Sequence, residues 1–315
     1  MTTFEQKIFD SLVNNSFLFF SEALKRLLDK DPNGLGQIDN NLLTLSCAEL
    51  QISLKLAVRA TLVKLHGIKS VLVSRHKNLP ECELEKLYSE NKLKVEEFDS
   101  QKNFLKSGDK CRLTKAEYKE IDRFQIYRNK IVHFTCDFSS QDLSCLRDDV
   151  LYYIVHVILV LLADTTTGET SSEFLQSKLG SDEYKRIKEY EPYVRAMERY
   201  AKKNSKTVWT CIGCSNRTYT PEEDYCYCCG YETLSGYRRV DCGIFGTKNS
   251  VIYDDWDIHN EGNHHTMPGM CLNCEEHTFV FECPECGEAH DTLLNLAGNY
   301  CSEGCCVNKK KSKKR

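Results

Sequence analysis

The sequence lacks any apolar segment long enough to span a membrane. Its longest apolar run, Val150–Ala163, covers fourteen residues and contains His156, whereas a transmembrane helix needs about 20. The run is therefore expected to form a buried core helix. The first ten residues have neither the basic start nor the apolar stretch of a signal peptide, so we expect a protein of a reducing, cytoplasmic compartment. With 41% hydrophobic and 28% charged residues, the composition also excludes wholesale disorder and a collagen-like fibre.

Cysteine is scarce in the first two thirds of the chain and abundant in the last third. Of the 18 cysteines, thirteen fall between Cys211 and Cys306. In a reducing compartment, cysteines at paired spacing bind metal rather than form disulfides. The change in density predicts a domain boundary near Lys202–Lys206. The earlier cysteines are isolated and are expected to be small, buried apolar side chains: Cys47, Cys82, Cys111, Cys136 and Cys145.

The charge balance changes at the same place. Residues 1–205 hold 31 basic and 30 acidic side chains, residues 206–306 hold 5 and 16, and residues 307–315 hold 6 and none. The net charge of −4 thus combines a nearly neutral region, an acidic module and a cationic tail. Because phosphate binding needs Lys and Arg, the acidic module is expected to recognise a protein partner or trigger. The tail either adds salt-sensitive RNA affinity or only keeps the chain soluble.

Helical periodicity dominates the first two thirds of the chain. A helix over about 115–134 has a predicted capping box at Thr114 and Glu117, and Pro192 is expected to interrupt the helical region 181–203. A helix that is apolar on two faces is expected at the centre of a bundle. The segment 40–66 has two such sets of apolar positions: Leu43, Cys47, Leu50, Leu54 and Ala57 on one face, and Leu45, Ala48, Ile52, Leu56 and Val63 on the other.

These patterns predict a mainly α protein with a small second domain. No strand pattern interrupts the first 205 residues, so an all-α helical bundle is expected over residues 1–165 and a helical extension over 166–206. A cysteine-rich, zinc-binding domain is expected over residues 207–306, followed by a basic, disordered tail over 307–315.

The helix over 115–134 carries an unusual set of polar side chains. Asn129 and His133 share one stripe of the helix, whereas Arg128 lies in line with Ile121 and Phe124 on a face that should be buried. A buried guanidinium is costly unless it is paired or serves a task. Arg128 is long enough to converge with His133 on one site. In the structural alternative, Arg128 pairs with an acidic side chain, Asp122 or Glu120, and His133 has no chemical role.

The segment Arg128–His133 resembles the signature of the HEPN family, in which an arginine, usually followed by a polar residue, precedes a histidine by a short spacing. The resemblance covers roughly residues 1–165, since the motif is late in a helical bundle and a long apolar helix follows it. Leu45–Lys55 is similar to the family's second long helix. The resemblance implies metal-independent RNA cleavage by a homodimer whose two motifs face each other. It also suggests a prokaryotic toxin or antiphage role.

In that chemistry, His133 would exchange protons with the RNA 2′-OH and the 5′-oxygen, and Arg128 would hold the phosphate. Asn129 would orient the histidine or a phosphate oxygen. The expected product is a 2′,3′-cyclic phosphate. The alternative function, from a different class, is a non-catalytic adaptor that binds a nucleotide or a protein and has a structural zinc module.

Five cysteine clusters occur between residues 207 and 306. Two Cys-x2-Cys turns supply the four-sulfur, tetrahedral site that Zn²⁺ prefers, and such closed sites are structural. The first set resembles a zinc ribbon: Cys211, Cys214, Cys226 and Cys229.

The remaining clusters allow two partitions, with two or three structural Zn²⁺ ions in total. In one, a set that resembles a treble-clef finger is formed by Cys283, Cys286, Cys301 and Cys305. Cys271 and Cys274 then need partners, which could be Cys242 with one of His259, His264, His265 and His277. In the other, a second ribbon leaves Cys301 and Cys305 spare and consists of Cys271, Cys274, Cys283 and Cys286.

Overall fold

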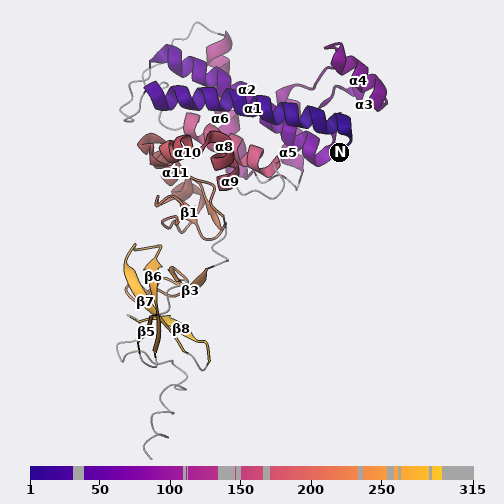
Figure 1. Ribbon diagram of the computed structural model, residues 1–315. Helices are drawn as coiled ribbons and strands as arrows, with labels where there is room; N and C mark the ends of the chain where they lie inside the picture. Colours follow the sequence, from indigo (N-terminus) through magenta and orange to yellow (C-terminus); the bar gives the residue numbers. More distant parts are fainter. Residues whose placement is uncertain are drawn as a thin grey trace, which may run out of the picture. The chain divides into compact units, whose positions relative to one another are not determined.

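In the computed structural model, the chain forms two compact units (Figure 1). A helical unit comprises Met1–Asn204 and Tyr227–Tyr231, and a cysteine-rich unit contains Ser205–Cys226 and the chain from Glu232 onward. We describe each unit by itself. The described residues are 1–30, 39–108, 111, 113–133, 146, 150–165, 171–232, 237–253, 259–261, 264–283 and 286–292.

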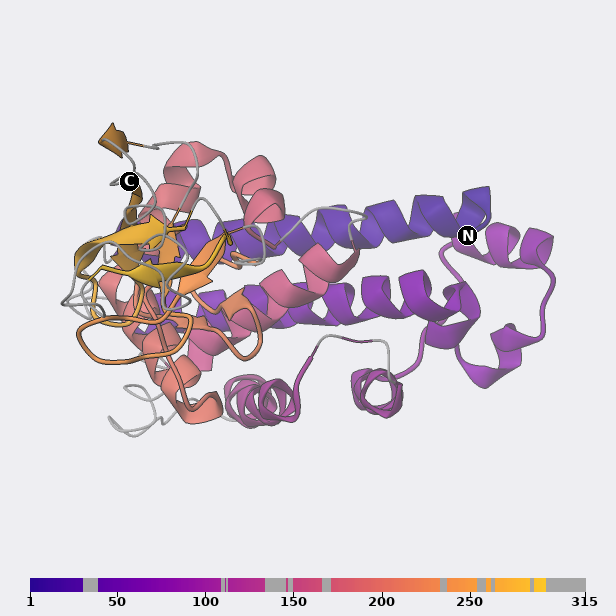
Figure 2. The ribbon, with the colours of Figure 1, turned by 90° about the horizontal axis from the view of Figure 1, so that it is seen from below.

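The helical unit is built around two long helices, α1 and α2, which lie side by side (Figure 2). Its described part contains no strand beyond an isolated bridge between Leu72 and Val95. Helix α8 contacts α1, α2, α6, α9 and α11. The elements are α1 (Thr3–Lys30), α2 (Asn40–His66), the 3₁₀ helix η1 (Ile68–Val71), α3 (Ser74–Lys77), α4 (Glu81–Ser89), α5 (Phe98–Ser107), α6 (Lys115–His133), α8 (Leu151–Thr165), α9 (Ser171–Leu179), α10 (Ser181–Glu189) and α11 (Glu191–Asn204).

Local sequence signals explain where these helices begin and end. The predicted capping box of α6 is confirmed, because the Thr114 N–H donates to Glu117 Oε2 (2.5 Å) and the Glu117 N–H donates to Thr114 Oγ1 (3.3 Å). Asp39 caps α2 by accepting the N–H of Leu42 (2.8 Å). Pro192 is the second residue of α11, after a break that follows α10, as predicted.

One of the two predicted apolar faces of α2 is confirmed and the other is wrong. Every residue of the Leu43–Ala57 face is buried. On the second face, Val63 is buried and Leu56 is half-buried, but Ala48 is exposed and Leu45 and Ile52 are 49% and 40% exposed. Serine occupies part of the buried surface instead, where Ser16 Oγ of α1 donates to Ser53 O of α2 (2.8 Å). Small hydroxyl side chains allow the two helices to approach closely and still satisfy their polar atoms.

Helix α8 is the most apolar part of the helical unit. All its residues through Ala163 are buried, which confirms the prediction of a core helix. Among the described residues, no helix is both long and apolar enough to cross a membrane.

A short segment of the cysteine-rich sequence, Tyr227–Tyr231, packs within the helical unit. The hydroxyl of Tyr193 donates to Cys228 O (3.0 Å), and that of Tyr184 donates to Cys229 O (3.4 Å). The Tyr227 ring packs against the His156 ring at a centroid distance of 5.2 Å. Burial of this segment is supported by hydrogen bonds to its backbone carbonyls.

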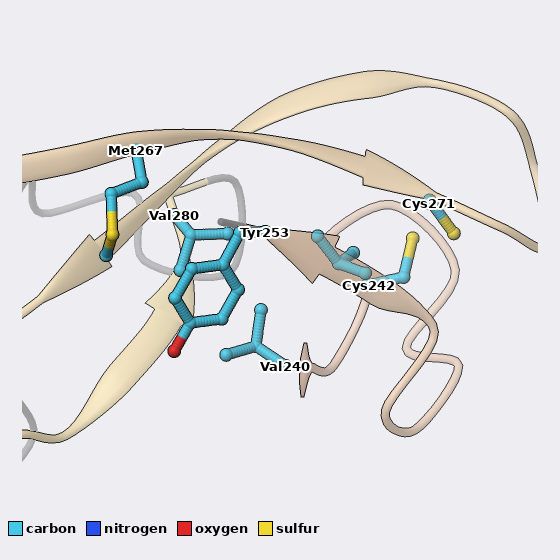
Figure 3. Packing of buried hydrophobic residues seen from close by; sticks show 7 residues of the cluster. Val240, Cys242, Tyr253, Met267, Cys271 and Val280 are labelled. Atoms are coloured by element: carbon cyan, nitrogen blue, oxygen red, sulfur yellow. The ribbon is translucent and has the colours of Figure 1, made fainter. Parts of the chain in front are cut away.

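The cysteine-rich unit contains a two-stranded and a six-stranded antiparallel sheet. The larger sheet has the order β3-β4-β6-β7-β8, with β5 also paired to β6. Its core cluster includes Val240, Tyr253 and Val280 (Figure 3). The strands are β1 (Tyr219–Thr220), β2 (Tyr225–Cys226), β3 (Arg238–Val240), β4 (Val251–Tyr253), β5 (His259–Glu261), β6 (His264–Cys271), β7 (His277–Glu282) and β8 (Ala289–Asp291).

Strand register decides which turns of the larger sheet meet. Val251 at the start of β4 pairs with Cys271 at the end of β6. The β3–β4 and β6–β7 turns therefore lie at the same end of the sheet. The β7–β8 turn lies at the opposite end, because β7 runs away from Cys271 along its whole length.

Candidate functional site

Four cysteines of the first predicted ribbon lie together. The Sγ atoms of these residues are all within 4.8 Å of one another, and those of Cys214 and Cys226 are 3.8 Å apart. A tetrahedral site with Zn–S bonds of about 2.3 Å requires S–S distances of about 3.8 Å. The geometry is therefore compatible with a bound metal ion at Cys211, Cys214, Cys226 and Cys229.

A backbone turn, which we call a knuckle, presents each of these thiols. The Cys211 N–H donates to Asn216 O (2.9 Å), and the Ser215 N–H donates to Cys211 O (2.8 Å). Ser215 has a positive φ of 59°, and Gly230 takes a φ of 71° at the equivalent place after Cys226. The Gly213 N–H points at Cys211 Sγ (3.3 Å). Such N–H donors favour a thiolate, the form that binds metal.

A second group of thiols contains Cys242, Cys271 and Cys274. Their Sγ atoms also lie within 4.8 Å of one another, and those of Cys242 and Cys274 are 3.9 Å apart. Figure 3 shows the side chains of Cys242 and Cys271 next to each other at one end of the sheet core. The group forms because the β3–β4 and β6–β7 turns share one end of the sheet. It matches the partition that pairs Cys271 and Cys274 with Cys242.

Burial and hydrogen bonds shift the pKa values of two thiols in the second group, Cys271 and Cys274. Burial opposes ionisation of Cys271, but a hydrogen bond with the Ser250 hydroxyl and donation from the N–H groups of Cys274 and Asn273 hold its pKa below the ordinary value. Burial and the neighbouring Cys271 and Cys242 raise the pKa of Cys274 to about 11. A cation at this position would offset that cost, since metal binding favours the thiolate.

Cys283 and Cys286 belong to neither group. They lie in the β7–β8 turn, at the other end of β7 from Cys271 and Cys274. The thiols of Cys283 and Cys286 therefore do not join those of Cys271 and Cys274 in a second ribbon. The other predicted partners, Cys301 and Cys305, lie outside the described residues, as do the side chains of His259, His264 and His265. His277 is exposed at the start of β7 and is not a member of either group.

The polar motif of the helical unit lies at the end of α6. Arg128 is half-buried, and its guanidinium donates to Asn129 Oδ1 (2.9 Å). His133 is the last residue of α6, and its side chain lies outside the described part of the structure. The position of Arg128 corrects the expectation that it lies on a buried face, because among the described side chains of that face Ile121 and Phe124 are buried, whereas Arg128 is half-buried.

The two carboxylates considered as partners for Arg128 are engaged elsewhere. Asp122 forms an ion pair with Lys102 (2.5 Å), and Glu120 pairs with Arg123 and with Lys203. Within the described part of the chain, no carboxylate forms an ion pair with Arg128. The alternative of a structural ion pair with these two residues is therefore not observed.

Two further cations lie on α2: Lys55 is close to Arg128, and Arg59 is close to Lys55. Burial lowers the pKa of Lys55, and the positive charges of Arg128 and Arg59 lower it further, against the opposing effect of Glu97 and Asp99. Burial also lowers the pKa of Arg59, whose Nε donates to Gln101 Oε1 (3.1 Å). A cluster of cations from α2 and α6 favours an anionic ligand. Sequence reasoning missed Arg59, although its position one helical turn after Lys55 was a signal for it.

A buried polar pair links α6 to α8. His156 Nε2 and Glu117 Oε1 are 3.2 Å apart, and both residues are buried. Glu117 also caps α6 through its other oxygen. His156 is therefore a hydrogen-bonded core residue of α8.

Comparisons with protein-family models, curated proteins and solved structures found no match to this chain.

Proposed function

We propose that this protein is a metal-independent endoribonuclease of the HEPN type that acts through Arg128, Asn129 and His133. One observation carries the proposal most directly. The half-exposed Arg128 has no carboxylate partner among the described residues and lies near a second cation, Lys55. An arginine that has no carboxylate partner can hold a phosphate bidentately.

The proposed reaction uses the RNA 2′-OH as the nucleophile. Its oxygen attacks the adjacent phosphorus, its proton passes to a general base, and the bond from phosphorus to the 5′-oxygen breaks. Protonation of that 5′-oxygen gives a 5′-OH end and a 2′,3′-cyclic phosphate. His133 is the residue we assign to proton transfer. Arg128 would stabilise the charge that develops on the phosphate oxygens, and Asn129 would orient the guanidinium by accepting a hydrogen bond from it.

We further propose that the enzyme is a homodimer and that its cysteine groups bind structural Zn²⁺, two or three ions per chain. The homodimer rests on the family resemblance, in which two motifs face each other; Ile126, 60% exposed two residues before Arg128, would lie beside that contact. The acidic cysteine-rich unit would bind a protein partner or trigger. A cytoplasmic toxin or antiphage effector is the biological role that the family resemblance suggests.

The test is RNA cleavage by the full chain without added divalent metal, with EDTA present during the assay. Arg128→Ala and His133→Ala should each lower the cleavage rate about 10²–10⁴-fold, the usual contribution of a positioned acid–base or charge-stabilising group. The matched control is Lys119→Ala. Lys119 is exposed on α6 nine residues before Arg128, on the opposite side of the helix, and its replacement should leave the rate unchanged.

The product ends and the metal content complete the test. Cleavage should leave cyclic phosphate and 5′-OH ends, and elemental analysis should show that the brief EDTA exposure left the bound metal in place. Equal cleavage by wild type and both variants would refute the assignment. If the wild type binds RNA or protein but cleaves nothing, the non-catalytic adaptor is the better description.

A further inference from the structure

The knuckles of the cysteine-rich unit share one backbone but differ in one side chain. Cys242, Cys271 and Cys283 each donate their N–H to the carbonyl five residues on and accept the N–H four residues on, as Cys211 does. The residues at the fourth position all have positive φ, between 59° and 74°: Ser215, Gly246, Glu275 and Gly287. The knuckles are therefore the same local structure.

The second thiol of a knuckle is three residues after the first. This position is Cys214, Cys274 or Cys286 in three knuckles and Phe245 in the knuckle of Cys242. Phe245 is 67% exposed, so it does not fill the sheet core in place of the missing thiol. The Cys242 knuckle keeps the backbone of a metal-binding turn and presents a single sulfur.

The second group consequently has three sulfur donors instead of four. Within the described part of the structure, no histidine, aspartate or glutamate joins Cys242, Cys271 and Cys274. The buried carboxylate of Asp291 on β8 is used differently. Its Oδ1 accepts the Thr278 hydroxyl (2.5 Å) and its Oδ2 accepts the Gly243 N–H (2.8 Å), so that it holds the knuckle backbone.

We propose that Cys242, Cys271 and Cys274 bind a thiophilic divalent ion, such as Zn²⁺, through three thiolates and that its fourth ligand is an exchangeable donor from solution. Zn²⁺ is four-coordinate in most protein sites, and sites with three protein ligands complete their shell with a solvent ligand or a substrate. Cys274 is only half-buried, which leaves a route for such a donor. The first group differs, because its four cysteines fill all four ligand positions of a tetrahedral site. This inference is independent of RNA cleavage.

Cadmium-113 NMR of the full chain tests the number of sulfur ligands at each site, because each added thiolate shifts the resonance downfield. The samples contain a phosphine reductant rather than a thiol. In wild type, the resonance lost on Cys242→Ser identifies the second group, and it should fall in the range of three-sulfur sites. Phe245→Cys restores the missing thiol and should move that resonance into the four-sulfur range. Phe245→Ser, the matched control, should leave it in place.

Exchange of the fourth ligand is tested by adding a small thiol, 2-mercaptoethanol. It should shift the second-group resonance of wild type and leave that of Phe245→Cys unchanged. A wild-type resonance already in the four-sulfur range would overturn the proposal, because another residue of the chain would then complete the site. It would also be overturned if Phe245→Cys moved no resonance or if the thiol had no effect on wild type. The Phe245→Cys arm remains decisive if Cys242→Ser fails to fold.

Discussion

The two units of this protein are stabilised in different ways. The helical unit buries large side chains such as Phe20, Phe124 and Phe174 completely, and apolar burial supplies about 25 cal/mol per Å². The core of the larger sheet is a cluster of seven buried residues, two of which are Cys242 and Cys271. A core that small rarely suffices for independent stability, and small domains commonly use metal to compensate. The helical unit is therefore held by extensive apolar contacts, whereas the sheet core of the other unit is small and includes two thiols.

Metal removal should have the largest effect and should act on the cysteine-rich unit. Structural zinc contributes about 10–16 kcal/mol of apparent binding free energy in small domains. Trp209 is buried and its backbone pairs with Tyr219 beside Cys211. Prolonged chelation, or Cys226→Ser, should shift Trp209 fluorescence to the red, while most helical circular dichroism remains. Cys82→Ser, at an exposed cysteine of α4, should change neither signal. Unchanged fluorescence after verified metal loss would contradict this account.

Truncation of the helical core should come next. Leu54→Ala removes a side chain that is fully buried on α2, and such changes cost about 2–5 kcal/mol in free energy of unfolding. Ile52→Ala, on the exposed side of the same helix, should stay within about 0.5 kcal/mol. Chemical denaturation followed at 222 nm measures both, with metal bound. Similar losses for the two variants would mean that the exposed face of α2 is covered in solution.

A smaller effect is expected from crowding the sheet core. A Cβ at Gly269 would lie 3.1 Å from both Val251 Cγ1 and Val280 Cγ2 and 3.2 Å from Ile252 O. Gly269→Ala should therefore cost about 1–3 kcal/mol and lower the thermal midpoint of the cysteine-rich unit. Gly108→Ala in the helical unit is the comparison, since its Cβ would meet nothing closer than 3.6 Å. A neutral Gly269→Ala would show that the sheet core adjusts more readily than the helical core.

The smallest effect concerns one hydrogen bond. Tyr193→Phe removes the donor to Cys228 O, and a buried carbonyl left without it should cost about 1 kcal/mol or somewhat more. Thermal unfolding of the helical unit should report the loss. The control is Tyr88→Phe. The Tyr88 ring is more exposed, and its hydroxyl forms no hydrogen bond among the described contacts, so this change should leave the stability unchanged. A neutral Tyr193→Phe would indicate that water replaces the tyrosine hydroxyl.

Sequence reasoning succeeded where the signal was local and failed where contacts across the chain decided. The Thr114–Glu117 capping box and the burial of α8 were predicted from neighbouring residues and are confirmed. The second apolar face of α2 was wrong, because periodicity shows which residues share a face but not whether another helix covers it. The knuckle of Cys242 was hidden from motif reasoning, because Phe245 interrupts the Cys-x2-Cys pattern although the backbone is unchanged.

Local sequence specifies the helical part of the chain and the turns that present thiols. These depend on side chains a few residues apart, where capping, periodicity and positive φ are settled. Which thiols meet depends instead on contacts between distant parts of the chain. The register of β4 against β6 brings Cys242 to Cys271, and the packing of α2 against α6 brings Lys55 near Arg128. Both pairings join residues far apart in the chain, and they form because strand pairing and helix burial favour one arrangement of the backbone.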